Sequence, residues 1–229
     1  MIVGNGLIAT AFKNSNIKHD NLVIFASGVS NSKESRAEEY ERELSLLAEV
    51  IKEEGSKKLI YFSSCSASPT SKAEYNKRKN YIEDFIQETA NDYLVLKLPN
   101  IVGPAIDNNQ LINFFYKSLF NQHKITLNTD CIRYLIDVAD LPSIVELLIK
   151  PEPQADIINV AFNNGVTVDI IVSYLESATG LTANSIEKVQ NGRDYYINNE
   201  TFLKHIENLN TFNTNPELII KKYYTHHEA

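Results

Sequence analysis

A tyrosine and a lysine four residues apart, Tyr75 and Lys79, are the residues of this sequence best suited to chemistry. They stand in the run AEYNKRKNYIEDFI, whose pattern predicts a helix, so both side chains share one helix face. A neighbouring ammonium favours proton exchange by a phenol near neutral pH. Ser64 precedes Tyr75 by 11 residues, in LIYFSSCS, and its hydroxyl could hydrogen-bond the same substrate oxygen. The three residues together predict a proton-transfer site for the interconversion of a carbonyl and an alcohol.

Each of these residues also has a simpler structural interpretation. A tyrosine and a lysine at this spacing often belong to a solvated helix face, and the serines around Ser64 could form an ordinary polar loop. Cys65 could be a nucleophile, but no histidine lies near it in the sequence, which favours a small buried residue. The positions of these residues relative to the predicted strands help to decide between the interpretations.

Small and polar residues follow each of the first four predicted strands. These clusters are Gly4-Asn5-Gly6, Ser27-Gly28, Ser63-Ser64 and Pro99-Asn100. In an open parallel sheet, ligands bind beside the carboxyl ends of the strands, so we expect the clusters to meet at one edge. The first cluster, in GNGLIA, has the glycine spacing of a turn that holds a phosphate at a helix start, although a glycine can also simply end a strand. The shared position of the clusters favours a functional edge.

The elements that must position these residues alternate between strands and helices. Short apolar strands are expected at 2–3, 22–26, 59–62 and 93–98, and helices at 7–13, 34–54 and 74–89. The second helix is densely charged, with an expected apolar face of Leu44, Leu47, Val50 and Ile51. Such an alternation predicts a parallel sheet covered by helices on both faces.

The order is less regular after Gly103. Helices are expected at 111–120, 141–149 and 168–179, with short strands at 124–127, 134–136 and 157–160, while the tail from Thr201 has only a weak helical signal. We expect a single unit over residues 1–229, with a core of residues 1–105 and about 134–160. The remaining segments, about 106–133 and 161–229, are expected to form a small C-terminal lobe.

Composition and charge narrow the class of protein. The 229 residues are 43% hydrophobic and 22% charged, as in an ordinary globular protein, with a net charge of −7. The sequence has no basic patch interleaved with aromatic residues, so nucleic acid is not an expected partner. Two cysteines without metal-ligand spacing predict neither a metal site nor a disulfide scaffold. The N-terminus lacks signal-peptide features and no apolar stretch is long enough to cross a membrane, so we expect a cytoplasmic protein without a membrane partner.

Together these motifs resemble the extended short-chain dehydrogenase/reductase superfamily, the NAD-dependent epimerase/dehydratase family. GNGLIA resembles its glycine-rich turn, VIFASGVSNS its segment beside the cofactor, LIYFSSCS its serine-containing strand end and YNKRK its tyrosine-x-x-x-lysine motif. VLKLPNIVGP is similar to its arginine-leucine-x-asparagine-x-x-glycine-proline pattern, with Lys97 in place of the usual arginine, and CIRYLIDVADL to its phosphate-binding segment. The motifs follow the family's order along nearly the whole chain. They look most like compact nucleotide-sugar reductases of capsule and O-antigen synthesis.

The resemblance implies a role for each matching residue. Tyr75 would be the catalytic proton donor or acceptor, Lys79 would assist it and bind the nicotinamide ribose, and Ser64 would bond the substrate oxygen. The residues expected to bind NAD or NADP are Gly4, Gly6, Leu7, Ile8, Ala26, Ser27, Gly28, Ser63, Tyr75, Lys79, Pro99 and Ile101. Besides Ser64, the residues expected to bind the substrate are Asn100, Arg133 and Arg193. The implied substrate is a UDP- or dTDP-linked sugar, and a homodimer is expected.

Two segments are shorter than the family pattern. Only 21 residues separate Gly4 from Phe25, where the family has a further strand, helix and strand that carry the residue reading the adenosine ribose. The choice between NAD and NADP therefore stays open. The loop from Ser64 to Tyr75 is also short, which implies a more open substrate site or one covered by other segments. The expected fold is thus a Rossmann-like α/β sheet with helices on both faces, a shortened N-terminal half and a small C-terminal lobe. The resemblance implies that the core binds the dinucleotide and that the lobe binds the substrate.

The function that these residues favour is reduction of a keto-deoxy nucleotide sugar by NADH or NADPH in surface polysaccharide synthesis, with Tyr75 as the proton donor. A nucleotide-sugar epimerase with tightly bound NAD would use the same residues. Outside enzymes, the alternative is a non-catalytic protein that binds dinucleotides or sugar nucleotides, which the shortened N-terminal half suggests. The presence of Ser64, Tyr75 and Lys79 together favours an enzyme.

Overall fold

The computed structural model of the protein describes residues 1–17, 20–104, 110–128, 131–150, 156–190, 197–206 and 211–225. The chain forms two compact units, each assembled from separate segments of the sequence. The first unit contains Met1–Leu98, Ala139–Val160 and Asn198–Glu207, and the second contains Pro99–Val138, Ala161–Ile197 and Asn208–Ala229. The chain therefore passes from one unit to the other several times.

The boundaries of the units differ from those expected from the sequence. Residues 99–105 and 134–138 belong to the second unit instead of the core, and Asn198–Glu207 belong to the first. The helix α7 (Glu200–His205) accounts for the latter difference, because it packs against β9 (Asp156–Asn159), a strand of the first unit.

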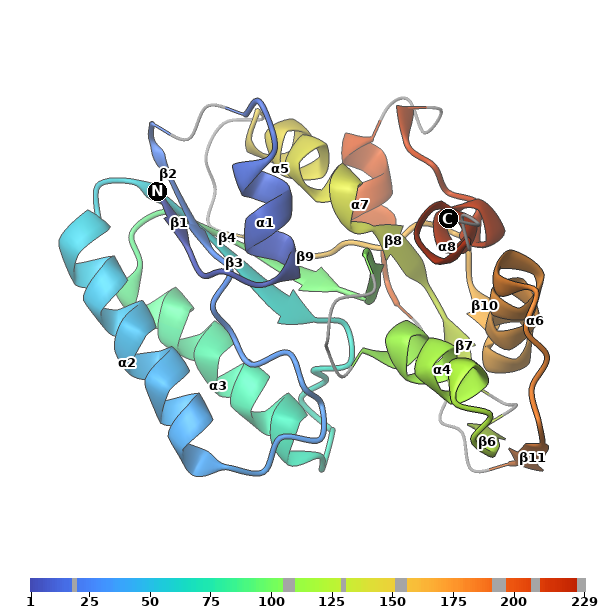
Figure 1. Ribbon diagram of the computed structural model, residues 1–229. Helices are drawn as coiled ribbons and strands as arrows, with labels where there is room; N and C mark the ends of the chain where they lie inside the picture. Colours follow the sequence, from blue (N-terminus) through green and yellow to red (C-terminus); the bar gives the residue numbers. More distant parts are fainter. Residues whose placement is uncertain are drawn as a thin grey trace. The chain divides into compact units, whose positions relative to one another are not determined.

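A five-stranded parallel sheet forms the centre of the first unit (Figure 1). Its strands, in spatial order, are β1 (Ile2–Val3), β2 (Leu22–Phe25), β3 (Lys58–Ser64), β4 (Tyr93–Leu98) and β9. Strands buried on both faces have continuous apolar sequences, and all four residues of β2 are buried. Val3 pairs with Phe25, and Phe25 pairs with Tyr61, so the carboxyl ends of the first three strands lie at one edge.

Helices cover both faces of this sheet (Figure 1). α1 (Leu7–Lys13) and α5 (Leu141–Ile149) lie on one face, and α2 (Ala37–Glu54) and α3 (Glu74–Thr89) lie on the other. The core beneath α2 and α3 is formed by Val23, Phe25, Leu47, Val50, Leu59, Tyr61, Ile82, Ile86, Tyr93 and Val95. This is the layered arrangement predicted from the alternation of strands and helices.

The buried stripe of α2 differs from the expected one. The helix begins at Ala37, and Leu44 and Ile51 are only partly buried. Its buried residues are Tyr40, Glu43, Leu47 and Val50. Their spacing of three, four and three residues keeps them on one side of the helix. A carboxylate, that of Glu43, therefore lies within the apolar stripe.

The second unit contains three two-stranded pairs among its described residues. β5 (Asn100–Val102) and β8 (Leu135–Asp137) are parallel, as are β6 (Ile125–Asn128) and β11 (Ile186–Val189), whereas β7 (Ile132–Arg133) and β10 (Val166–Thr167) are antiparallel. The helices of this unit are α4 (Leu111–Phe120), α6 (Val168–Thr179) and α8 (Pro216–Tyr224). A short 3₁₀ turn, η1 (Val138–Asp140), leads into α5.

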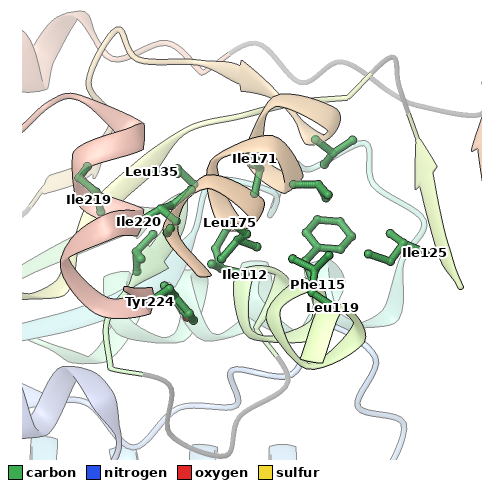
Figure 2. Close-up of a cluster of buried hydrophobic side chains, with 14 of the residues drawn as sticks. Ile112, Phe115, Leu119, Ile125, Leu135, Ile171, Leu175, Ile219, Ile220 and Tyr224 are labelled. Atoms are coloured by element: carbon green, nitrogen blue, oxygen red, sulfur yellow. The ribbon is translucent and has the colours of Figure 1, made fainter. Parts of the chain in front are cut away.

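The three helices of the second unit share one apolar cluster (Figure 2). Among its members are Ile112, Phe115 and Leu119 of α4, Ile171 and Leu175 of α6, and Ile219, Ile220 and Tyr224 of α8. Lys222 and Tyr223 of α8 also donate hydrogen bonds to the buried carboxylate of Asp137. The tail from Thr201 thus contains two helices, α7 and α8, where only a weak helical signal was expected. No helix in the described ranges combines the length and the apolar character needed to cross a membrane.

Candidate active site

The turn after β1 brings the end of that strand close to the end of β2. Gly4 has a φ of 120°, and a Cβ built on it would lie 2.4 Å from the carbonyl oxygen of Ala26. Only glycine fits this approach of two backbones. A Cβ on Gly6 would instead meet nothing within 4 Å, so the space above this residue is open. Lys13 Nζ donates a hydrogen bond to the Gly4 carbonyl oxygen at 3.0 Å, which places an ammonium beside the turn.

The residues on either side of this turn belong to the same edge of the sheet. Leu7 and Ile8, both half-buried, begin α1, and Ala26 follows the last residue of β2. The guanidinium of Arg42 holds Ser27, with Nη1 3.2 Å from its Oγ and Nη2 3.1 Å from its carbonyl oxygen. The first two clusters predicted at strand ends are therefore neighbours in the first unit.

Tyr75 and Lys79 occupy the buried face of α3. Their exposed fractions are 9% and 2%, and Lys79 Nζ lies 5.9 Å from the centroid of the Tyr75 ring, within the range of a cation–π contact. Tyr75 packs with Val29 and Tyr40 in a small buried cluster. The two side chains face each other as the helical spacing predicts, and the interpretation as a solvated helix face is wrong.

Lys79 forms a buried ion pair. Its Nζ donates to Oε1 of Glu43 at 3.0 Å and to the hydroxyl of Tyr61 at 2.9 Å. The Tyr61 hydroxyl donates in turn to Glu43 Oε1 at 2.5 Å, and the Val29 N–H donates to Glu43 Oε2 at 2.8 Å. Gly28 lies directly against this pair, because a Cβ built on it would be 2.6 Å from Glu43 Oε1 and 2.9 Å from Lys79 Nζ. Hydrogen bonds thus compensate the burial of both charges.

Tyr61 is a neutral hydrogen-bonding link within this network. Burial raises the pKa of Tyr61 well above its ordinary value, and the negative charge of Glu43 raises it further. The phenol therefore keeps its proton at neutral pH, donates to the carboxylate and accepts from the lysine.

Ser64 is joined to the start of α3 through side chains. Its Oγ lies 2.8 Å from the Oγ of Ser66, which donates to Oδ1 of Asn76 at 2.9 Å. Asn76 follows Tyr75 directly in the first turn of α3. The loop after β3 is therefore tied to the helical turn that carries the tyrosine.

A second buried ion pair lies beside the strand end of β3. Glu83 Oε1 accepts a hydrogen bond from Ser63 Oγ at 2.5 Å, and Glu83 Oε2 pairs with Lys97 Nζ at 2.8 Å. Lys97 also donates to the carbonyl oxygen of Ala67 at 2.7 Å. The hydroxyl of Ser63 is thus directed to Glu83. Lys97 thus holds both α3 and the loop after β3.

Cys65 is the remaining residue of this strand end with potential reactivity. Burial raises the pKa of Cys65 to about 12, although the positive charge of Lys97 opposes the shift. Its Sγ donates to the Lys97 carbonyl oxygen at 3.0 Å. The residue is half-buried, and a thiol that stays protonated at neutral pH fits the structural interpretation of Cys65 and not the role of a nucleophile.

Two of the residues expected to bind the substrate are close together in the second unit. The backbone N–H and the side-chain Nδ2 of Asn100 donate to the carbonyl oxygen of Tyr134, at 3.1 and 3.3 Å. Arg133 is the residue before Tyr134 and pairs with Val166 in the β7–β10 ladder. Its Nη1 donates to the carbonyl oxygen of Ile132 at 2.9 Å.

The other residues expected to bind a ligand are divided between the units. Pro99 and Ile101 belong to the second unit, like Asn100 and Arg133, and the Ile101 side chain is buried. Arg193 lies outside the described residues. The first unit by itself brings together Gly4, Gly6, Leu7, Ile8, Ala26, Ser27, Gly28, Ser63, Ser64, Tyr75 and Lys79.

Three buried residues that hydrogen-bond the predicted site were themselves not predicted from the sequence. Glu43, Tyr61 and Glu83 hold the side chains of Lys79, Ser63 and Lys97. One signal was present for Glu43, which stands four residues before Leu47 and seven before Val50, on the same side of its helix. A single charged residue on an apolar stripe indicates a buried ion pair or hydrogen-bond network.

Comparisons with known proteins show likeness at the level of structure. No protein-family model and no curated protein matches the sequence. Among solved structures, UDP-glucose 4-epimerase from Thermus thermophilus in complex with NAD superposes with a TM-score of 0.70 at 16% identity, over 89% of this chain and 77% of that chain. UDP-N-acetylglucosamine 4-epimerase from Methanobrevibacter ruminantium, in complex with UDP-N-acetylmuramic acid, has a TM-score of 0.67 at 18% identity, over 89% and 75%.

A dehydratase has the same fold. dTDP-glucose 4,6-dehydratase from Bacillus anthracis, in complex with NAD, superposes with a TM-score of 0.66 at 17% identity, over 89% of this chain and 71% of that chain. At these identities the likeness is one of fold. The predicted Rossmann-like α/β class, with a parallel sheet between two layers of helices, is confirmed.

Proposed function

We propose that the protein is an NAD(P)-dependent enzyme of nucleotide-sugar metabolism, and that it reduces a keto-deoxy nucleotide sugar in surface polysaccharide synthesis. The observation that carries the proposal is the facing pair of Tyr75 and Lys79 on the buried side of α3, with the Ser64 loop tied to the first turn of the same helix. A phenol, an ammonium and a hydroxyl in this arrangement are suited to exchanging a proton with a carbonyl or alcohol oxygen.

In the proposed reaction, Tyr75 donates a proton to the keto oxygen while the Ser64 hydroxyl hydrogen-bonds that oxygen. The positive charge of Lys79 favours the phenolate that Tyr75 becomes. The dinucleotide, when bound, would supply the hydride. The turn formed by Gly4 and Gly6 fits such a ligand, because the backbone is close-packed at the first glycine and open at the second.

The substrate class is supported by two observations. The similar solved structures include an epimerase and a dehydratase crystallised with NAD, and an epimerase crystallised with a UDP-linked compound. In the second unit, Asn100 and Arg133 flank the same residue, Tyr134, and we propose that they hold the substrate diphosphate. A guanidinium is suited to this task in a chain whose net charge of −7 repels anions overall.

Two alternatives have specific support. A nucleotide-sugar epimerase with tightly held NAD would use the same three residues, and two of the similar structures are 4-epimerases. A non-catalytic protein that binds dinucleotides or sugar nucleotides is favoured by one feature, since Lys79 is 2% exposed and paired with Glu43. The phenol, the lysine and the serine loop favour an enzyme over the non-catalytic alternative. Between the two enzymes, we propose the reductase because the sequence motifs look most like those of compact nucleotide-sugar reductases.

One experiment separates the three functions. Thermal-shift titrations with NADH, NADPH and NAD are followed by incubation with a UDP- or dTDP-linked 4-keto-6-deoxy sugar and product analysis. A reductase consumes one NADH or NADPH for each sugar reduced, whereas an epimerase changes the sugar's configuration without net cofactor consumption. Dinucleotide binding without turnover of any offered sugar supports the non-catalytic alternative. No binding of any dinucleotide would refute the proposed function.

A further inference from the structure

The carboxylate of Glu43 is a buried charge to which the proposed proton transfer assigns no part. The residue is 1% exposed and its two oxygens accept hydrogen bonds from three different elements. Lys79 Nζ donates from α3, the Tyr61 hydroxyl from β3, and the Val29 N–H from the segment after β2. Because both oxygens are engaged, the carboxylate is fixed in one orientation against the lysine.

The ammonium of Lys79 lies between this carboxylate and two phenol rings. Its Nζ is 5.2 Å from the centroid of the Tyr61 ring and 5.9 Å from that of the Tyr75 ring. The titratable groups around it are Glu43 from α2, Tyr61 from β3 and Tyr75 from α3, and Tyr40 of α2 packs in one cluster with Tyr75. The buried carboxylate of Glu83, whose charge also acts on Tyr61, is paired with Lys97. Glu43 is thus the carboxylate that hydrogen-bonds the ammonium. A buried ammonium that lacks such a partner tends to lose its proton.

The backbone after β2 is shaped around the same pair. A Cβ on Gly28 would lie 2.6 Å from Glu43 Oε1 and 2.9 Å from Lys79 Nζ, so a side chain at this position would displace the charged ends of the pair. The next residue, Val29, supplies the N–H that holds the second carboxylate oxygen. A segment expected to line the cofactor is thus packed directly on the ion pair.

We propose that Glu43 is a positioning residue, which keeps the Lys79 ammonium charged and fixes it beside the Tyr75 ring. The inference rests on the proposed function, because it gives the proton-transfer pair a third member from α2. Glu43 acts through Lys79 and does not itself touch the substrate. Replacement by glutamine keeps the size of the side chain and removes its charge, so Glu43→Gln should leave Lys79 as an uncompensated buried cation.

The direct test is nitrogen NMR of the lysine side chains in protein labelled with ¹⁵N-lysine. The Lys79 Nζ signal is assigned by its loss in Lys79→Met. The wild-type signal, recorded between about pH 6 and pH 9, is the reference. In Glu43→Gln we expect the signal to move to that of a neutral amine within this range.

A matched control comes from the second unit. The carboxylate of Asp137 is 2% exposed and, like that of Glu43, accepts hydrogen bonds from a lysine and a tyrosine, Lys222 and Tyr223. Asp137→Asn should lower the thermal stability of the protein without changing the Lys79 signal. An identical Lys79 titration in Glu43→Gln and in the wild type would overturn the inference.

A second variant keeps the inference testable if Glu43→Gln does not fold. Glu43→Gln combined with Lys79→Met removes both charges, and an ion pair of this kind predicts that the double variant folds where the single one does not. If the double variant also fails to fold while Lys79→Met alone folds, the two residues do not depend on each other and the inference is overturned.

Titration with NADH and NADPH separates this inference from the proposed function. Wild-type protein that binds neither dinucleotide overturns the proposed function, whereas the NMR titration still decides whether Glu43 holds the charge of Lys79. If the wild type binds NADH, Glu43→Gln should bind it about tenfold more weakly at pH 9 than at pH 6.5, the loss expected for a charged hydrogen bond. A pH dependence no greater than that of the wild type or of Asp137→Asn would contradict the positioning role.

Discussion

The thiol of Cys65 follows Ser64 in the chain and lies at the edge where we place the reaction. Burial raises the pKa of Cys65 to about 12, and its Sγ donates to the backbone of Lys97. At pH 8 a thiol with this pKa is ionised in about one molecule in ten thousand, so its reactivity as a nucleophile is very small. Proximity to a proposed catalytic serine therefore gives this side chain no chemical role.

The reactivity of Cys65 provides a prediction about pH. In a Cys131→Ser variant, where Cys65 is the remaining cysteine, alkylation by iodoacetamide at pH 8 should be slow in the folded protein and fast after unfolding in urea. The folded-state rate should keep rising up to about pH 12, because the thiolate fraction grows until the pH reaches the raised pKa. Mass spectrometry of the Cys65 peptide measures both rates. Equal rates in folded and unfolded protein at pH 8 would contradict the raised pKa of the thiol.

The polar residues of the site were only partly predictable from the sequence. Tyr75 and Lys79 could be found because their partnership is local, four residues along one helix. The partnership of Lys79 with Glu43 spans 36 residues and three elements, so no local spacing reveals it. Leu44 was assigned to the apolar face for the same reason, because the position of the stripe on α2 depends on the sheet and on α3.

At the level of elements, the ends of β1 and β2 set the spatial limits of the site. Gly4 and Gly28 are each confined by neighbouring atoms, the first by backbone and the second by the Glu43–Lys79 pair. Gly6 has open space instead, and its φ of −77° is an ordinary value for any residue. Two glycines of this edge are thus confined by neighbouring atoms, and the third has open space above it.

The glycines at this edge should differ in their response to substitution. Gly28→Ala is expected to lower the free energy of unfolding by roughly 1–3 kcal/mol, because the new methyl group overlaps Glu43 and Lys79. Gly6→Ala should change it by less than about 1 kcal/mol. Urea denaturation followed by circular dichroism measures both values. An alanine at 28 that is as well tolerated as one at 6 would show that the backbone does not lie against the ion pair.

The order of the elements was predictable from the sequence, whereas the last helix was not. The parallel strands and their helices follow from apolar runs and periodicity. α8 has a recognisable start, since Asn215 accepts hydrogen bonds from the N–H groups of Glu217 and Leu218 and Pro216 occupies the first helical position. The tail of the chain from Thr201 is nevertheless polar. The burial of α8 comes from packing on α6, a contact that local sequence does not show.

At the level of the whole molecule, the chain builds two units that are each discontinuous in sequence. The resemblance to a known family predicted one core and one lobe. It placed residues 134–138 in the core, whereas they belong to the second unit, and it placed Asn198–Glu207 in the lobe, whereas they belong to the first unit. These short segments follow local packing, which for α7 is contact with β9. Homodimerisation stays a prediction from the resemblance.

The second unit should depend on α8 for its stability. Ile220 is fully buried in the shared cluster (Figure 2). Leu218, two residues earlier in the same helix, is 53% exposed. Ile220→Ala is expected to lower the free energy of unfolding by about 2–5 kcal/mol, and Leu218→Ala by less than about 1 kcal/mol. Chemical denaturation of the two variants measures this difference. Equal losses would show that α8 does not pack as described.

The central claim is that Tyr75 transfers a proton during reduction of a keto sugar. Single-turnover reduction of a UDP- or dTDP-linked 4-keto-6-deoxy sugar, with the dissociation constant of the cofactor measured alongside, tests this claim most directly. Tyr75→Phe should slow the reaction by about 10² to 10⁴-fold with little change in cofactor affinity, because a general acid contributes this much to the rate. Tyr81→Phe, a change at an exposed tyrosine of the same helix, should leave the rate within about twofold of the wild type. A Tyr75→Phe variant that retains the wild-type rate would contradict the account.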